Sequence, residues 1–192
     1  MMKIIAATGN KNKIREFGEI LKGYEIVSQK EAGFTGEVEE NGASFLENAV
    51  LKATAVAKAL GVPALADDSG ICCDALGGAP GIFSARYAGN HGNDEENNLL
   101  LKKNLQGKDR SAYYFCAVAL AYPDGTYLFG EGRTDGVFMD EPQGENGFGY
   151  DPYFYSTEIR KPFGLATPEE KNSVSHRARA LRQLYAKLGE TI

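Results

Sequence analysis

Cysteine is scarce in this chain of 192 residues, and its cysteines follow neither a disulfide pattern nor a metal-binding pattern. There are three, Cys72, Cys73 and Cys116, and no C-x-x-C pair occurs. An odd count without paired spacing argues against both a disulfide framework and a zinc site. We expect buried, reduced thiols, which are typical of a cytoplasmic protein.

The chain also lacks long apolar runs and an excess of positive charge. No stretch approaches the roughly 18 apolar residues of a membrane helix, and the opening stretch MMKIIAATGN is too short for a signal peptide. The chain has 21 Lys and Arg against 26 Asp and Glu, a formal net charge of -5. This balance argues against a general nucleic-acid binder, although a few placed cations and a metal can still hold one phosphorylated ligand.

What is present favours one domain over residues 1–192, either a single body or a body with a small lobe. Hydrophobic residues make up 43% and charged residues 24%, enough for a packed core. Periodicity and turn signals predict strands over 3–8, 24–28 and 64–66, helices over 13–23, 44–61, 93–107 and 175–188, and a hairpin over 111–134. Alternating strands and helices followed by a hairpin predict an α/β fold with a mixed sheet.

Two adjacent acids follow the strand predicted over 64–66. The stretch VPALADDSGICC places Asp67 and Asp68 where this apolar run stops, and the run resumes only at Ile71. Asp, Ser and Gly are ordinary turn residues, so a turn is one interpretation. A metal or acid–base site at the mouth of a sheet is the other, because ligands gather beyond the carboxyl ends of strands.

A second candidate lies between the first predicted strand and the first predicted helix. TGNKNK, residues 8–13, combines a glycine that permits close approach with donors and lysines at a helix start, which suits a phosphate. The stretch matches neither a Walker motif nor G-x-G-x-x-G. A plain turn with surface lysines therefore stays open.

Lys52 is unusual because the predicted helix over 44–61 places it at the edge of the apolar stripe. Its stem can pack there while the ammonium reaches water, or a fixed anion can meet it. Glu39 and Glu40 precede this helix, and Asp67 and Asp68 follow it. Carboxylates can lie beside a phosphate-binding turn if Mg²⁺ bridges the carboxylates to the phosphates.

The fourth candidate combines two segments, GFGYDP over 147–152 and KNSVSHRAR over 171–179. Phe148 and Tyr150 can stack on a flat base, and Asp151 can accept a hydrogen bond from a base or a sugar. Lys171, His176 and Arg177 can donate to carbonyl oxygens. A turn followed by a basic helix start is the simpler interpretation, but cations at a helix N-terminus oppose the helix dipole.

These segments together resemble the inosine triphosphate pyrophosphatase family. The matching stretches are ATGNKNKIREF, ENGASFLENAVLKA, ALADDSGICCDALGGAPGIFSARYAG, GFGYDPYF and KNSVSHRARAL, and they span nearly the whole chain. The resemblance implies a long mixed sheet flanked by helices, with a cleft between two lobes. It also implies Mg²⁺-dependent hydrolysis of ITP, dITP and XTP to the monophosphate and pyrophosphate, by a cytoplasmic homodimer that binds neither nucleic acid nor membrane.

The resemblance further implies a role for each matching residue. Asp68 is the general base and, with Glu40, a metal ligand, while Lys52 contacts phosphate; the roles within the pairs Asp67/Asp68 and Glu39/Glu40 are less secure. The substrate-binding residues implied are Thr8, Gly9, Asn10, Lys11, Asn12, Lys13, Ser69, Phe148, Gly149, Tyr150, Asp151, Lys171, His176 and Arg177.

Two rival functions differ from this one in testable ways. One is the related Maf-like pyrophosphatases, which act on other bases; the segments GFGYDP and SHRAR argue against them. The other is a nucleotide-binding sensor without chemistry. A sensor is expected to lack Asp68 or Lys52, and both residues are present.

Overall fold

A computed structural model describes residues 2–89, 92–189 and 192 of the chain. It contains a seven-stranded sheet in the order β2-β1-β3-β4-β5-β6-β7. β1 pairs in parallel with β2 and with β3, whereas β6 is antiparallel to β5 and β7, so the predicted mixed sheet is confirmed. The strands are β1 (Met2–Ala6), β2 (Tyr24–Ser28), β3 (Ala64–Cys73), β4 (Ser111–Ala121), β5 (Tyr127–Phe138), β6 (Phe154–Ser156) and β7 (Lys161–Pro162).

Four of the helices were predicted from the sequence and one was not. They are α1 (Lys11–Ile20), α2 (Phe45–Leu60), α3 (Asp94–Asn104), α4 (Pro168–Val174) and α5 (His176–Lys187). The missed helix, α4, has a capping box between Thr167 and Glu170. Four short 3-10 helices complete the list: η1 (Asp74–Leu76), η2 (Gly81–Arg86), η3 (Asp151–Tyr153) and η4 (Phe163–Leu165).

The chain divides into two compact units, each built from separate segments. Unit 1 comprises Met1–Asp68, Cys116–Gly132 and Arg177–Ile192, and unit 2 comprises Ser69–Phe115 and Arg133–His176. Strands β3, β4 and β5 contribute residues to both units, and the single domain expected over residues 1–192 stays a prediction. The cleft between lobes that the resemblance implies stays a prediction.

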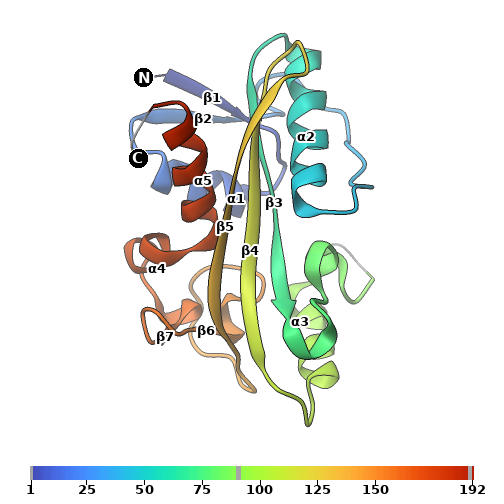
Figure 1. Ribbon diagram of the computed structural model, residues 1–192, viewed down its shortest axis with the longest axis vertical. Helices are drawn as coiled ribbons and strands as arrows, with labels where there is room; N and C mark the ends of the chain where they lie inside the picture. The colour runs from blue at the N-terminus through green and yellow to red at the C-terminus, as the bar shows by residue number, and fades with distance from the viewer. Residues whose placement is uncertain (1, 90–91, 190–191) are drawn as a thin grey trace. The chain divides into compact units, whose positions relative to one another are not determined.

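In unit 1, helices cover both faces of the sheet (Figure 1). One face packs on α1 and α5 through a buried cluster that includes Phe17, Leu65 and Leu181. The opposite face packs on α2 through a cluster of small residues that includes Ala53 and Ala66. Ser44 caps the start of α2 by accepting from Glu47 N, and Gly61 ends the helix in a left-handed conformation, so the caps lie at the bounds predicted for this helix.

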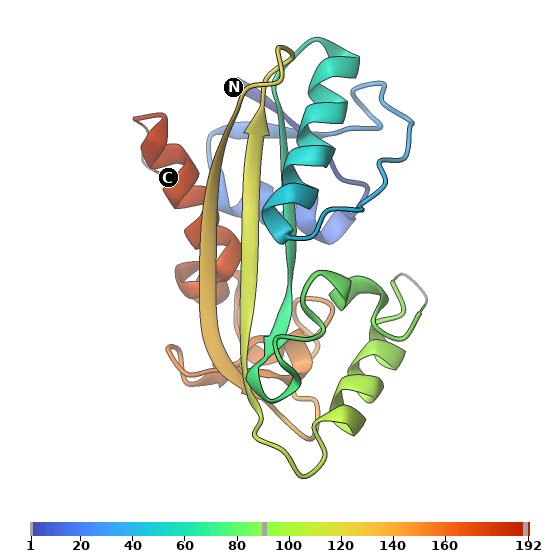
Figure 2. The ribbon, with the colours of Figure 1, turned by 45° about the vertical axis from the view of Figure 1, so that its right-hand side comes forward.

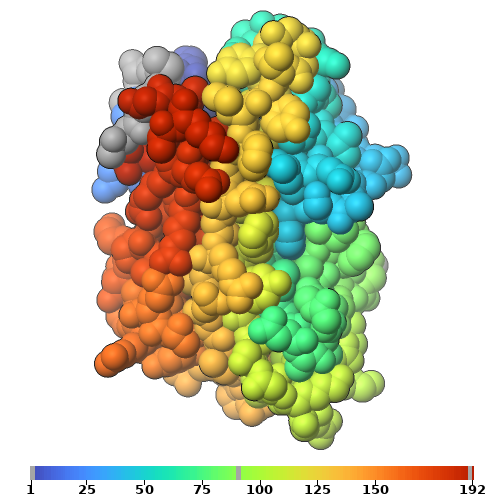
Figure 3. Space-filling model, viewed as in Figure 1, coloured from blue at the N-terminus to red at the C-terminus, as the bar shows by residue number. Residues whose placement is uncertain are grey.

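β5 and α5 approach each other closely in unit 1, and they lie side by side in both ribbon views and on the surface (Figures 1–3). A side chain at Gly130 of β5 would overlap the backbone carbonyl of Ala180 in α5. Glycine is therefore required at this position, because any larger residue would push the helix off the sheet.

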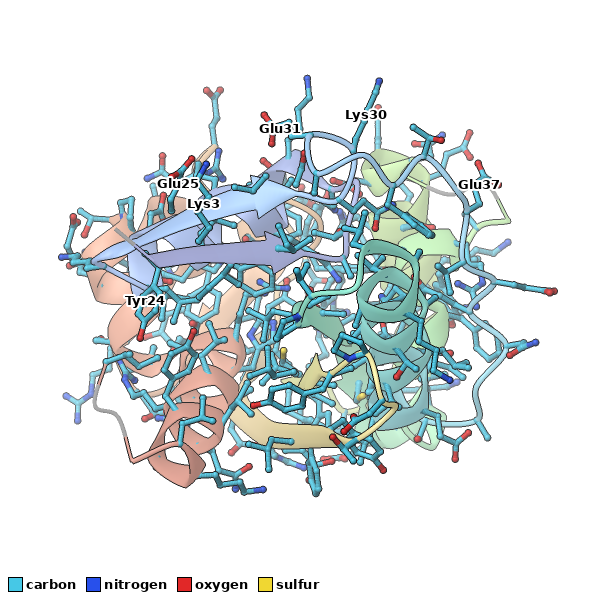
Figure 4. The ribbon with its side chains drawn as sticks, turned by 90° about the horizontal axis from the view of Figure 1, so that it is seen from above. Lys3, Tyr24, Glu25, Lys30, Glu31 and Glu37 are labelled. Carbon is cyan, nitrogen blue, oxygen red and sulfur yellow. The ribbon has the colours of Figure 1, made fainter. Side chains whose placement is uncertain are left out.

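The parallel pair β1 and β2 lies at one edge of the sheet, and its outer side chains form an exposed ion pair and a turn. Lys3 lies opposite Glu25 in the register, and their charged groups are 3.4 Å apart (Figure 4). Glu31 accepts from the Ser28 hydroxyl at 2.6 Å and closes the turn after β2. Among the described residues, no helix is both long enough and apolar enough for a membrane span.

Unit 2 has its own buried cluster, which includes Ile71 of β3, Leu101 of α3, Tyr114 of β4 and Phe138 of β5. The stretch from Ser69 to Gly70 passes through this unit in extended form. A side chain at Gly70 would overlap the Ser84 hydroxyl, which accepts from Ile71 N at 3.0 Å. Gly70 is thus required by close packing rather than by a turn.

The prediction that a strand ends at Asp67 is wrong, and so is the turn interpretation. β3 runs without interruption from Ala64 to Cys73, through both aspartates. The acids interrupt the apolar pattern because their side chains are paired inside the protein: Asp67 is 1% and Asp68 6% exposed. Buried charges are rare unless they are paired, and both aspartates lie beside cations of the protein.

Candidate active site

Asp67 and Asp68 are neighbours on β3 with entirely different surroundings. Side chains alternate between the faces of a strand, so Asp67 shares a face with Leu65, and Asp68 shares the other face with Ala66. Leu65 belongs to the cluster formed with α1 and α5, whereas Ala66 belongs to the cluster formed with α2. One pair of residues therefore supplies a carboxylate to each side of the sheet.

Asp67 is the centre of a buried ion-pair network. Arg177 donates to its Oδ2 from Nη2 at 2.8 Å and from Nε at 3.2 Å, and Lys13 Nζ lies 3.2 Å from its Oδ1. Burial alone would raise the pKa of Asp67, but nearby cations, chiefly Lys13 and Arg177, hold that pKa well below its usual value. Asp67 is therefore ionised and committed to protein partners.

Glu16 of α1 completes this network and was missed by the sequence analysis. Its carboxylate accepts from Arg177 Nη1, and the residue is 3% exposed. Burial opposes the charge on Arg177, yet Asp67 and Glu16 raise the pKa of the guanidinium above its usual value. Arg177 thus meets two carboxylates of its own chain, and its expected contact with a purine stays a prediction.

Asp68 has different partners from those of Asp67. Asn48 of α2 donates to its Oδ2 at 3.0 Å, and Lys52 Nζ lies 3.9 Å from its Oδ1. Burial raises the pKa of Asp68, and the charges of Lys52 and Lys13 offset this only in part. A carboxylate with a raised pKa is suited to accept a proton.

Lys52 is buried and paired, so the interpretation of a stem packed beneath a water-exposed ammonium is wrong. The residue is 8% exposed, and its Nζ lies 2.9 Å from Glu40 Oε1. Burial lowers the pKa of Lys52, but nearby carboxylates, led by Asp68, raise it above its usual value. Within the pair Glu39 and Glu40, it is Glu40 that contacts the lysine, and Glu39 is exposed.

The chemistry of these groups fits a magnesium ion in part. Within the described ranges, no three or more His, Cys, Asp or Glu side chains form a ready metal site. Glu40 and Asp68 nevertheless flank one cationic group, the Lys52 ammonium. Mg²⁺ is commonly held by one or two carboxylates together with substrate phosphates, so two oxygen ligands suffice for a shared site.

The turn over 8–13 is ordered by its own side chains. Asn10 is the N-cap of α1, and its Oδ1 accepts from Asn12 N at 2.9 Å and from Lys13 N at 3.3 Å. Thr8 Oγ1 accepts from Asn10 N at 3.1 Å, while Lys11 is exposed. A Cβ added at Gly9 would meet nothing within 4 Å, so the turn is open at this residue.

In unit 2, the buried side chain of Asp151 holds the GFGYDP segment by hydrogen bonds. It is 2% exposed, and its Oδ2 accepts from Phe148 N at 2.8 Å and from Lys171 Nζ at 2.6 Å. The hydroxyl of Tyr114 donates to its Oδ1 at 3.1 Å. Asp151 therefore organises the loop in this structure, and its expected bond to a base or sugar stays a prediction.

The two aromatic residues of this segment have different environments. Tyr150 is 5% exposed, belongs to the buried cluster and donates its hydroxyl to Ser84 O at 2.8 Å. Phe148 is half-buried, with Lys171 Nζ 5.2 Å from its ring centroid. Phe148 is thus the partly exposed ring of the pair, whereas Tyr150 anchors the loop.

His176 and Arg177 are adjacent, yet they belong to different units. The His176 ring stacks on Tyr114 in unit 2, with centroids 4.6 Å apart and planes inclined by 9°. α5 begins at His176, one residue after the Ser175 cap of α4. The His176 ring is held by Tyr114, and the Arg177 cation that opposes the helix dipole is held by Asp67 and Glu16, which accounts for the local inconsistency seen in the sequence.

A sequence profile of the Ham1 family matches residues 4–187. The chain belongs to the Ham1 family. A dITP/XTP pyrophosphatase of Desulfotalea psychrophila is 48% identical over 192 residues, covering 98% of this chain and 86% of the relative. A dITP/XTP pyrophosphatase of Bacillus subtilis is 46% identical over 189 residues, covering 96% of each chain.

The fold agrees with solved Ham1 structures. A HAM1 protein from Coxiella burnetii is 40% identical, has a TM-score of 0.87 and is covered in full, as is this chain. The predicted family and fold class are therefore confirmed.

The structure assigns the predicted site residues of this Ham1 protein to the two units. Unit 1 holds Thr8, Gly9, Asn10, Lys11, Asn12, Lys13, Glu40, Lys52, Asp68 and Arg177. Unit 2 holds Ser69, Phe148, Gly149, Tyr150, Asp151, Lys171 and His176. Residues implied for phosphate and metal thus gather in unit 1, and most residues implied for the base gather in unit 2.

Proposed function

We propose that this chain hydrolyses noncanonical purine nucleoside triphosphates, namely ITP, dITP and XTP, to the monophosphate and pyrophosphate. The observation that carries the proposal is the contrast between two adjacent buried carboxylates. Asp67 is held ionised by Arg177 and Lys13, while burial raises the pKa of Asp68 beside Lys52. The curated relatives bear the name of this activity, and the chain matches them over nearly its whole length.

Asp68 is the proposed general base. Attack at the α-phosphorus needs a water molecule in line with the leaving pyrophosphate, and a carboxylate that orients and deprotonates that water. Asn48 holds one oxygen of Asp68 at 3.0 Å. The other oxygen lies 3.9 Å from Lys52 Nζ, whose charge attracts the carboxylate.

Glu40 and Asp68 are the proposed ligands of a magnesium ion. When bound, this ion would neutralise charge on the triphosphate. Lys52 contributes a fixed positive charge beside the same carboxylates, and Lys13 contributes another at the start of α1. The open turn at Gly9 lets a phosphate approach the backbone without meeting a side chain.

Base recognition is assigned to the second unit. The half-buried ring of Phe148 offers a face on which a purine can stack, Lys171 Nζ lies 5.2 Å from that ring, and His176 of the same unit is the other proposed donor. Hypoxanthine and xanthine carry an oxygen at position 6, whereas adenine carries an amino group there. Donors that bond this oxygen are left unpaired against adenine, which disfavours ATP. The base-reading role implied for Arg177 requires its guanidinium to leave Glu16 and Asp67.

Release of pyrophosphate from ITP, with Mg²⁺ and then with EDTA, tests this function. We expect turnover with Mg²⁺, none after chelation, and recovery when Mg²⁺ is restored. Full activity in EDTA would contradict the metal assignment. Binding of ITP without any product would instead favour a nucleotide sensor.

A homodimer in the cytoplasm remains part of this proposal on family resemblance alone. Sedimentation equilibrium across a range of protein concentrations tests the assembly, and a monomeric mass throughout would refute it. Fractionation of cells that express the chain tests the compartment.

A further inference from the structure

Helix α3 holds both backbone polar groups of Gly149, the residue that follows Phe148. Gly149 N donates to Asp94 Oδ2 at 2.9 Å, and Gly149 O accepts from Asn98 Nδ2 at 3.0 Å. Asp94 and Asn98 are one turn apart on α3, so they face the same side of the helix. The peptide groups on both sides of one loop residue are therefore fixed from a single helix face.

The orientation of the Asn98 amide is determined by its partners. Asn98 is 5% exposed, and its Nδ2 also donates to Asp94 O at 2.8 Å. A flipped amide would set its oxygen against two carbonyl oxygens, so the donor end must face the loop. Its Oδ1 is buried and accepts no hydrogen bond from the residues that the structure describes. The hydrogen bonding of this side chain is therefore concentrated on Asp94 and Gly149.

Gly149 is also the residue of this loop most in need of restraint. Its φ is +63°, in the left-handed region that glycine enters freely, and a Cβ there would meet nothing within 4 Å. The two hydrogen bonds to α3 therefore restrain its backbone. Glycine without such contacts samples many backbone conformations, so Phe148 would lose its restraint on the Gly149 side and keep only that from Asp151 on its own backbone N–H.

The same helix restrains a second segment of unit 2. Asn97, which precedes Asn98, accepts from Ala88 N at 2.8 Å and donates to Ala85 O at 3.3 Å. Ser84 O, next to Ala85, accepts the hydroxyl of Tyr150 at 2.8 Å. The loop that carries Phe148 and the segment over 84–88 are thus fastened to α3 and to each other.

We propose that Asp94 and Asn98 are positioning residues for base recognition, which fix Gly149 and so hold the Phe148 ring where the purine stacks. The inference rests on the proposed function, in which Phe148 contacts the base. A loop already ordered before binding costs the substrate less ordering entropy, so this restraint lowers KM. The two hydrogen bonds from Asp94 and Asn98 to Gly149, called the clamp below, also keep the donors around the base in place. Removing the clamp should therefore lower kcat/KM for ITP more than kcat/KM for ATP.

Two variants remove the clamp, and two matched variants control for their other effects. Asp94→Ala deletes the acceptor for Gly149 N, and Asn98→Leu deletes the donor to Gly149 O. Glu95→Ala also removes an acid from the first turn of α3, but spares the loop. Asn104→Leu deletes an amide that donates instead to the Tyr87 hydroxyl, at 2.8 Å.

A conservative variant separates positioning from helix charge. Asp94→Asn removes the charge at the helix start but retains an oxygen that can accept from Gly149 N. The readouts are kcat and KM for ITP and for ATP, together with hydrogen exchange of the Gly149 amide followed by NMR. The exchange measurement reports the clamp whether or not the enzyme turns over.

We expect Asp94→Ala and Asn98→Leu each to raise KM for ITP by about tenfold, to change kcat little and to narrow the preference for ITP over ATP. Exchange at Gly149 should quicken in both. Glu95→Ala, Asn104→Leu and Asp94→Asn should behave like the wild type. If Asn98→Leu fails to fold, Asp94→Ala still decides, because Asp94 is exposed.

Unchanged exchange at Gly149, or faster exchange with unchanged KM and preference, would overturn the positioning role. A wild-type protein that shows no preference for ITP would overturn the proposed function and this inference with it. A wild-type preference that survives both clamp variants would overturn this inference alone.

Discussion

The adjacent aspartates should give opposite phenotypes when each is replaced by asparagine, a change that keeps shape and removes charge. Asp67→Asn removes the one carboxylate that meets both Lys13 and Arg177, the latter 1% exposed and bonded to it by two hydrogen bonds, and leaves Glu16 to offset the buried guanidinium. Removing one partner of a buried ion pair costs about 3–5 kcal/mol. For a chain of this size, that loss lowers Tm by about 6–20 °C.

Asp68→Asn should keep the fold and lose the chemistry. Burial raises the pKa of Asp68, which means that folding disfavours its ionised form. A neutral amide removes this cost of burying a charge. Lys52 retains Glu40 at 2.9 Å, so no buried cation is left alone. We expect an unfolding free energy within about 1 kcal/mol of the wild type. We expect kcat to fall at least about 10²-fold, the usual scale for a lost general base.

The difference in stability between the wild type and Asp67→Asn should also depend on pH in a defined direction. Because the pKa of Asp67 is depressed in the folded state, its contribution is present above the pKa of an unfolded Asp, about 4, and is lost as pH falls below it. The difference in Tm between the wild type and Asp67→Asn should therefore be largest near neutral pH and shrink below pH 4.

Thermal unfolding and pyrophosphate release from ITP, measured on both variants, test this assignment. Equal stability of Asp67→Asn and the wild type would refute the ion-pair network. Retention of most activity by Asp68→Asn, with loss in a stable Asp67→Asn, would show that the base is the other aspartate.

Two further substitutions separate structural from ligand-dependent effects. Lys52→Met leaves Glu40 and Asp68 without their shared cation, so kcat should fall at least about 10²-fold, whereas Lys58→Met, an exposed lysine on the same helix, should have no effect. An active Lys52→Met enzyme would remove the lysine from the chemistry. Gly9→Ala should leave Tm unchanged or slightly higher, since the added Cβ meets nothing, yet raise KM for ITP if phosphate binds there. Unchanged KM would show that no ligand approaches Gly9.

The sequence indicated the fold class correctly because its signals are local. Apolar periodicity located α1, α2, α3 and α5, and the cap residues Ser44 and Gly61 marked the ends of α2. Helix α4 was missed although its start signal was present. Thr167 and Glu170 form a capping box with a proline at the first helical position, a pattern that predicts a helix N-terminus.

The aspartates were misread because the partners that keep them in a strand lie far away in sequence. Arg177 is 110 residues from Asp67, and no residue near Asp67 in the sequence indicates that the two will pair. Glu16 could not be singled out for the same reason, since its partner is 161 residues away. Strand alternation was the one usable signal: if β3 continues, adjacent acids must face opposite sides.

Base-side residues show the same limit. The motif GFGYDP marked a loop, but which aromatic ring faces outward depends on the bond from Tyr150 to Ser84, 66 residues apart. Asp94 and Asn98 sit in an ordinary acidic helix start, and only the fold brings them to Gly149.

Base selectivity, with identification of the phosphorus product, tests the central claim most directly. The measurement is kcat/KM of the unmodified protein for ITP, XTP, ATP and GTP with Mg²⁺, with products resolved by ³¹P NMR. We predict pyrophosphate and the monophosphate as the only products, and kcat/KM for ITP and XTP well above that for ATP and GTP. Comparable kcat/KM for ATP and ITP, or release of orthophosphate with a diphosphate, would contradict the account.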